Sequence, residues 1–160
     1  MGTQFRVYLP RCDRNDGVSP FPEVGKVVEG KQRKVLLVDD EDSVRMVMAM
    51  TLEDCGFEVE EAADGQIAKE MFNRNPDAYA ALVLDYMMPN ANGAEVAQLI
   101  KETRPELPII LSSGVWSEKE SPDESYEAYR KLGDVGMKKP FSATRLMAVM
   151  HDLLDRPDPV

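Results

Sequence analysis

The segment that decides the fold is Lys34–Arg45, which reads KVLLVDDEDSVR. Its apolar run Val35–Val38 has the length of a short buried strand, and it ends in the paired carboxylates of Asp39 and Asp40. The residues after this pair have the composition of a helix. An apolar strand that passes through a polar turn into a helix is the repeating unit of α/β proteins. The segment therefore predicts one β–α unit with an acidic pair at the carboxyl end of its strand.

The same alternation of short apolar strands and helices continues along the chain. Five such units in about 120 residues predict an α/β fold with a doubly wound parallel sheet and helices on both faces. Gly56 is a candidate to end the first helix, Ser142 is a candidate N-cap of the last, and Pro122 interrupts the fourth. The predicted strands are Val35–Val38, Phe57–Ala62, Ala80–Leu84, Pro108–Leu111 and Val135–Lys138, and the predicted helices are Ser43–Cys55, Gln66–Asn73, Gly93–Thr103, Glu118–Leu132 and Ser142–Leu154.

Composition limits what the chain can do. Its 160 residues suffice for one ordinary domain with a short appendage. No stretch approaches the ~18 apolar residues of a membrane span, so we expect no direct membrane contact from this chain. Two cysteines without a disulfide framework predict a cytoplasmic location, which is compatible with a membrane-anchored parent protein. The net charge of −10 argues against nucleic-acid binding, which requires neutralisation of phosphates. Cys12 and Cys55 lack metal-site spacing, and with His151 alone the chain offers little for Ser/His or Cys/His catalysis.

Polar side chains stand at the carboxyl ends of four predicted strands. Asp39 and Asp40 follow the first strand, Asp85 the third, Ser113 the fourth and Lys139 the fifth. One such residue is ordinarily a loop or cap residue, but polar residues at the same end of four strands are hard to assign to chance. Ligands of open α/β sheets bind outside this edge, at the point where the strand order reverses. The sequence therefore predicts a ligand site there.

The chemistry of this set is coherent. Three carboxylates brought together repel one another strongly, since two unit charges ~4 Å apart cost about 4 kcal/mol at an effective dielectric constant near 20. Such a cluster takes up protons, an ammonium group or a metal ion, and oxygen ligands without His or Cys favour Mg²⁺. Mg²⁺ shares phosphate oxygens, and an aspartate can accept a phosphoryl group as a nucleophile. Lys139 would offset the charge of that group, and Ser113 could donate a hydrogen bond to it.

Four segments together resemble the receiver domain of two-component response regulators. The resemblance covers about Lys34 to Leu154, and we assign 34–155 to this domain and 156–160 to a tail. It implies a flavodoxin-like (βα)5 fold with strand order 2-1-3-4-5, which places the first and third strands on either side of the switch point. The segments are Lys34–Arg45, Leu82–Gly93 (LVLDYMMPNANG), Pro108–Gly114 (PIILSSG) and Lys138–Phe141 (KKPF).

The resemblance also implies a role for each polar residue. Asp85 would be the phosphoacceptor, with Ser113 as the switch hydroxyl and Lys139 as the lysine typical of the family. Mg²⁺ would be bound directly by Asp40 and Asp85 and through water by Asp39. Two main-chain features complete the expectation: the carbonyl of Met87 would be a metal ligand, and the peptide bond before Pro140 would be cis.

The N-terminal segment carries a second resemblance. Gln4–Leu9 alternates like a strand, and the stretch that contains it, Gly2–Pro10 (GTQFRVYLP), looks like the closing strand of a histidine-kinase ATP-binding domain. We therefore assign 1–10 to a remnant of such a domain and 11–33 to a linker rich in Pro and Gly. This layout implies the C-terminal receiver of a hybrid sensor histidine kinase. The donor would be a histidine kinase or the chain's own kinase domain, and a histidine phosphotransfer protein is a possible acceptor.

Some positions depart from the family pattern. Gly136 stands where the family usually has a Phe or Tyr on the fifth strand, and the stretch between Ser113 and Lys139 is long. Signalling through the usual aromatic switch and fourth helix is therefore in doubt. Met87 and Val115, which in this family flank the path of the hydrolysing water, offer that water no hydrogen bond. We therefore predict slow autodephosphorylation, with the chain acting as a phosphoacceptor and not as a kinase.

Two alternatives remain open at this level. Asp40-Glu41-Asp42 after an apolar strand matches the DxD pattern of haloacid-dehalogenase-type Mg²⁺ phosphatases, in which Asp40 would be the nucleophile and Asp42 the general acid. That alternative leaves the segment from Asp85 to Gly93 unexplained. The second is a degenerate receiver that binds partners without phosphorylation, against which the complete acidic set and Lys139 argue.

Overall fold

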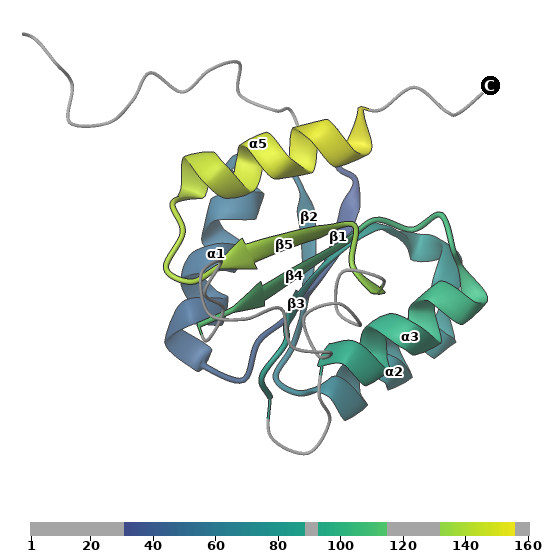
Figure 1. The fold of residues 1–160 in the computed structure, drawn as a ribbon. Coiled ribbons are helices and arrows are strands. Elements are labelled where there is room, and N and C mark those ends of the chain that lie inside the picture. The colour runs from purple at the N-terminus through teal and green to yellow at the C-terminus, as the bar shows by residue number, and fades with distance from the viewer. Residues whose placement is uncertain (1–30, 89–92, 115–131, 156–160) are drawn as a thin grey trace, which may run out of the picture.

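The computed structural model describes residues 31–88, 93–114 and 132–155. Its centre is one five-stranded parallel sheet with the order β2-β1-β3-β4-β5, and helices cover both of its faces (Figure 1). This confirms the predicted flavodoxin-like fold and strand order. The strands are β1 (Lys34–Val38), β2 (Glu58–Ala62), β3 (Tyr79–Asp85), β4 (Ile109–Ser113) and β5 (Val135–Lys138), and the helices are α1 (Asp42–Asp54), α2 (Gly65–Arg74), the short 3-10 turn η1 (Pro76–Ala78), α3 (Gly93–Thr103) and α5 (Ala143–Leu154).

The core consists of two apolar layers, one on each face of the sheet. Successive residues of a strand point to opposite faces, so β1 contributes Val35 and Leu37 to one layer and Leu36 and Val38 to the other. The first layer packs against α1 and α5, and the second packs against α2 and α3 (Figure 1). Strands buried on both faces read as continuous apolar runs, which explains why β1 and β3 are apolar throughout their interiors.

Capping residues fix the helix ends near the predicted positions. The side chain of Ser142 accepts a hydrogen bond from the main-chain N–H of Arg145 at 3.2 Å, which confirms it as the N-cap of α5. Asp64 caps α2 in the same way through Ile67 at 2.8 Å. Gly56 follows α1 with φ of 82°, a conformation that glycine adopts without the steric cost of a side chain.

Two strands extend farther than predicted, and the extension matters for the site. β3 includes Asp85 and β4 includes Ser113, so both side chains are held by the strands themselves and not by the following loops. Both positions pair in the ladder, since Asp85 lies opposite Ser112 and Ser113 opposite Lys138. Main-chain pairing with neighbouring strands keeps these polar residues in the sheet despite their weak strand preference.

Several predictions fall outside the described residues. These are the N-terminal strand 1–10, most of the linker 11–33, most of the fourth helix, the tail 156–160, Cys12 and Val115. Arg33, at the end of the predicted linker, donates to the main-chain oxygen of Leu154 at 3.3 Å and lies over the ring of Phe57. Among the described residues, no helix is long and apolar enough to cross a membrane.

Candidate acidic site at the carboxyl edge of the sheet

The strand register brings the predicted polar residues to one place. Val38 of β1 pairs with Leu84 of β3, so the residues that follow them, Asp39 and Asp85, become neighbours. On the other side, β5 pairs with β4, and the N–H of Lys139 donates to the carbonyl of Ser113 at 2.8 Å. Parallel pairing aligns carboxyl ends of strands, and this is why residues separated by up to a hundred positions meet at one edge.

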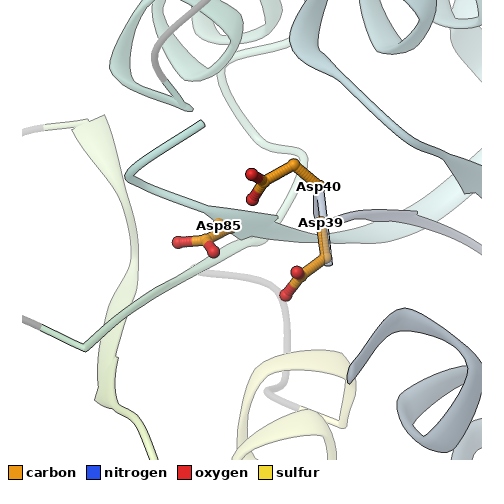
Figure 2. A group of neighbouring side chains, drawn as sticks. All are labelled: Asp39, Asp40 and Asp85. Carbon is orange, nitrogen blue, oxygen red and sulfur yellow. The ribbon is translucent and has the colours of Figure 1, made fainter. Parts of the chain in front are cut away.

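Three carboxylates and one ammonium group form the centre of the site. Asp39, Asp40 and Asp85 each offer a carboxylate oxygen, and these atoms lie within 4.8 Å of one another (Figure 2). Lys139 Nζ donates to Asp39 Oδ2 and to Asp85 Oδ2, both at 2.6 Å. The side chains of Asp39 and Asp85 are 0% and 9% exposed, whereas Asp40 is exposed. One ammonium group therefore faces three carboxylates, two of them buried.

Main-chain donors hold the two buried carboxylates in place. The N–H of Glu41 donates to Asp39 Oδ1 at 3.0 Å, and the N–H of Met87 donates to Asp85 Oδ1 at 3.1 Å. Each buried carboxylate thus accepts one main-chain bond and one bond from Lys139. This preorganisation lets buried charge persist at a position where an unpaired carboxylate would be costly.

The charge state of Lys139 follows from two opposing effects. Burial lowers the pKa of the lysine, but the hydrogen bonds and negative charges of Asp39 and Asp85 outweigh it and raise the pKa above its usual value. Lys139 is therefore fully protonated at neutral pH. The main-chain hydrogen bond to Ser113 holds the backbone of Lys139 against β4. The peptide bond to Pro140 is cis, as the family resemblance implied.

The remaining predicted residues lie at the same edge. Ser113 is fully buried at the end of β4. Met87 stands two residues after Asp85, with its main-chain N–H bonded to the Asp85 carboxylate, and the residue is 57% exposed. Gly136 is exposed on the edge strand β5, and the next residue, Met137, is buried. No aromatic side chain therefore occupies this position of β5.

The donor set fits a magnesium ion. It consists of carboxylate oxygens alone, two of them fixed by hydrogen bonds and the third exposed to solvent. Hard oxygen donors and a solvent-facing side suit Mg²⁺, which binds few protein ligands and keeps several waters. Positive charge at this place would also offset the negative charge that Lys139 leaves uncompensated.

A profile of the response regulator receiver domain matches residues 35–151, a stretch that includes all four strand ends of the site. The chain belongs to the response regulator receiver domain family. An acidic triad like Asp39, Asp40 and Asp85 is typical of the Mg²⁺ site of such receivers. Because the chain belongs to this family, the interpretation as a receiver is favoured over the phosphatase alternative, in which Asp40 would be the nucleophile. Asp42, the general acid of that alternative, is 89% exposed and paired with Arg45.

Two curated relatives illustrate the range of proteins that contain similar receivers. The chain is 30% identical over 166 residues to "Sensor kinase CckA" of Brucella abortus, in an alignment that covers 98% of this chain and 17% of that protein. It is 34% identical over 123 residues to "Transcriptional regulatory protein SrrA" of Staphylococcus aureus, in an alignment that covers 77% of this chain and 48% of that protein. The chain thus spans less than half the length of either relative.

Solved structures agree with the fold. The receiver domain from the hybrid histidine kinase CckA superposes with a TM-score of 0.63 at 27% identity, covering 76% of this chain and 99% of that one. The response regulator TrrA from Thermotoga maritima, solved in complex with Mg²⁺-BeF, gives a TM-score of 0.65 at 30% identity with the same coverage.

Sequence reasoning missed two residues that support the site. Arg45 donates to the main-chain oxygen of Asp39 at 2.7 Å, and a Cβ at Gly93 would overlap the main-chain oxygen of Asp85. Both residues lie within the quoted motifs, but their contacts are with main-chain atoms. A sequence pattern shows which side chains follow a strand and gives no sign of which carbonyl a distant side chain reaches.

Proposed function

We propose that this receiver domain accepts a phosphoryl group from a phosphohistidine onto Asp85, with Mg²⁺ held by Asp39, Asp40, Asp85 and the main-chain carbonyl of Met87. One observation carries the proposal: Asp85 is a buried strand-end carboxylate, 2.6 Å from Lys139 Nζ, in a cluster with the carboxylates of Asp39 and Asp40. Receiver domains accept phosphate from histidine kinases, so Asp85 is the group best placed to do so here.

The transfer exchanges one bond to phosphorus for another. A carboxylate oxygen of Asp85 attacks the phosphorus, the P–N bond of the phosphohistidine breaks, and its electron pair returns to the imidazole. Bound Mg²⁺ would supply positive charge next to the phosphoryl oxygens. Lys139 Nζ lies close enough to Asp85 to donate to a phosphoryl oxygen once that carboxylate gives up its negative charge.

The acyl phosphate would then act through residues at the same edge. Ser113, at the end of the neighbouring strand, is the candidate to donate its hydroxyl to the phosphoryl group. At Gly136 the chain has no aromatic side chain that could change position when Ser113 bonds to the phosphoryl group. We therefore place the output in onward phosphotransfer to a histidine phosphotransfer protein or in a change of the surface around β4 and β5.

We also propose that the chain comes from a hybrid sensor histidine kinase. The alignment with sensor kinase CckA covers 98% of this chain, whereas that with SrrA covers 77%. The first alignment therefore includes sequence before the receiver, where residues 1–10 resemble the end of a kinase ATP-binding domain. Immunoblotting of the source cells tests this origin: a species far heavier than 17.9 kDa supports it, and a band at that mass refutes it.

Phosphorylation by a small phosphodonor tests the main proposal. The protein is incubated with acetyl phosphate and Mg²⁺, and the modified residue is mapped by mass spectrometry. We expect one phosphoryl group on Asp85 that requires Mg²⁺ and is lost in Asp85→Asn. Asp77→Asn is the matched control, because Asp77 is 91% exposed and precedes β3 at the opposite edge of the sheet.

The other outcomes are informative. An adduct on Asp40 would replace this proposal with the phosphatase alternative. A protein that is modified neither by acetyl phosphate nor by a phosphorylated histidine kinase would be a degenerate receiver, and the proposal would be refuted. Modification by the kinase alone would retain the proposal and show that the donor must be phosphohistidine.

A further inference from the structure

The three carboxylates of the site are not held equally. Asp39 and Asp85 each accept a main-chain hydrogen bond and a bond from Lys139. Among the described residues, no hydrogen bond or ion pair reaches the carboxylate of Asp40. Figure 2 shows the Asp40 side chain leaving the end of β1 in a different direction from that of Asp39. The orientation of Asp40 therefore depends on the main chain that carries it.

Arg45 holds that main chain. Its Nη1 donates to the carbonyl oxygen of Asp39 at 2.7 Å, and this carbonyl belongs to the peptide unit that leads into Asp40. Rotation of this peptide unit would swing the Asp40 side chain away from the cluster. A hydrogen bond from a charged donor is about twice as strong as a neutral one, so the contact restricts such rotation.

Two ion pairs anchor Arg45, which itself lies in the first turn of α1. Its Nη2 donates to Asp42 of the same helical turn at 2.6 Å, and its Nε lies 3.3 Å from Glu61 on β2. Its side chain is 14% exposed, so little of the guanidinium group faces water. The fork geometry of a guanidinium group allows three such contacts at once, which a lysine cannot make. Arg45 thus connects its own helix, α1, to the loop after β1 and to β2.

We infer that Arg45 is a positioning residue for the metal site, which orients Asp40 toward Mg²⁺ through the Asp39–Asp40 peptide unit. The inference rests on the Mg²⁺ site of the proposed function and assigns it a support outside the acidic set. Hydrogen-bond partners that orient metal ligands commonly contribute ten- to a hundredfold to metal affinity. We therefore expect loss of Arg45 to weaken Mg²⁺ binding about tenfold.

The sign of this effect separates positioning from simple electrostatics. Arg45 is a positive charge close to an anionic site, so its removal makes the local potential more negative and should tighten binding of a cation. If Arg45 instead positions Asp40, its removal should weaken the binding of Mg²⁺. A weaker affinity after loss of a positive charge therefore cannot come from charge alone.

The test is a titration with MgCl2 of the wild-type protein, Arg45→Met, Arg45→Lys and the control Arg74→Met, followed by 15N–1H NMR spectra. Arg74 is exposed at the end of α2, at the opposite edge of the sheet, and its loss removes the same charge. We expect about tenfold weaker binding for Arg45→Met, an intermediate loss for Arg45→Lys, and unchanged or slightly tighter binding for Arg74→Met. In the metal-free spectra, the amide signals of Asp40 and Glu41 should move in Arg45→Met while that of Met87 stays in place.

A double-mutant cycle asks whether Arg45 acts through Asp40. In an Asp40→Asn background, the further change Arg45→Met should alter Mg²⁺ affinity less than twofold, because the residue that it positions is already lost. A full tenfold loss in that background would overturn the inference, as would unchanged or tighter binding by Arg45→Met alone. If Arg45→Met does not fold, Arg45→Lys with an affinity within twofold of the wild type would overturn it. Failure of the wild-type protein to bind Mg²⁺ would instead refute the proposed function, and this inference with it.

Discussion

Both ends of the sheet place one lysine between two carboxylates, with different consequences. At the amino edge, Lys34 Nζ lies 2.9 Å from Glu58 and 2.8 Å from Glu60. At the carboxyl edge, Lys139 Nζ lies 2.6 Å from Asp39 and from Asp85. The pKa of each lysine is raised by its pair of acids. By charge alone, the two arrangements are alike.

Burial separates them. The side chains of Glu58 and Glu60 are 58% and 37% exposed, whereas those of Asp39 and Asp85 are 0% and 9% exposed. Water screens the excess negative charge at the amino edge, so that arrangement needs no further cation. At the carboxyl edge the excess is buried and a third carboxylate, Asp40, is added. An acidic cluster points to a cation site when its charges are both unbalanced and buried.

The largest expected effect comes from removing each lysine in turn. Lys139→Met leaves two buried carboxylates without their counterion, and we expect it to lower the free energy of unfolding of the metal-free protein by about 3 kcal/mol. Mg²⁺ should restore more stability to this variant than it adds to the wild type, because the ion replaces the lost charge. Lys34→Met should cost clearly less and show no added response to Mg²⁺. Urea denaturation with and without Mg²⁺ measures the free energy of unfolding of both variants. Equal losses of stability in the two variants would contradict the contrast between the two edges.

The next effect concerns the backbone beside Asp85. A Cβ at Gly93 would overlap the main-chain oxygen of Asp85, so Gly93→Ala must move the start of α3 or the end of β3. We expect a loss of about 2–3 kcal/mol in urea denaturation, together with slower phosphorylation. Gly114→Ala is the matched control, because a Cβ there would meet nothing within 4 Å. Similar stability of the two variants would show that the close approach at Gly93 is not needed.

A smaller effect is expected on the lifetime of the acyl phosphate. Met87, an exposed residue two positions after Asp85, has a side chain that offers no hydrogen bond to an attacking water. Met87→Asn should therefore shorten the lifetime of phospho-Asp85 by roughly tenfold, because the amide can orient that water. The decay of the intact phosphorylated mass after removal of the donor gives the lifetime. An unchanged lifetime would contradict the prediction of slow autodephosphorylation by an unassisted water.

The smallest effect belongs to the amino edge and depends on pH. The hydrogen bond from Lys34, assisted by that from Tyr79, lowers the pKa of Glu60 below its usual value. A carboxyl group whose pKa is lowered by folding stabilises the protein above its unfolded pKa and loses that contribution as pH falls through the folded value. The urea midpoint of Glu60→Gln should therefore fall less than that of the wild type between about pH 6 and about pH 3. Identical pH profiles would show that this pairing adds nothing measurable.

Features that depend on local apolar patterns could be predicted from the sequence, whereas features that depend on contacts between distant residues could not. Apolar runs of strand length, such as that of β1, locate strands because both faces of a parallel sheet are buried. Parallel order then carries Asp39, Asp85, Ser113 and Lys139 to one edge, so the site was predictable before the fold was seen. The sequence did not predict where β3 and β4 end, because main-chain pairing with neighbouring strands extends both strands through polar residues.

The role of Arg45 could not be predicted for a different reason. Its three contacts depend on the path of the loop after β1 and on the distance between α1 and β2, and neither follows from residue spacing. The Lys34–Glu60 pair is hidden in the same way, because an acidic strand reads simply as an exposed edge. Patterns predict which elements form and in which order, and long-range polar contacts appear only once these elements are packed.

The central claim is that buried, unbalanced carboxylates at the carboxyl edge form a Mg²⁺ site around Asp85. A crystal structure of the wild-type protein grown with Mg²⁺ tests it most directly. The account predicts one ion bonded to Asp40, Asp85 and the main-chain oxygen of Met87, with Asp39 reached through water and Lys139 still beside Asp85. An ion bound elsewhere, or an acidic cluster that holds no ion at saturating Mg²⁺, would contradict it.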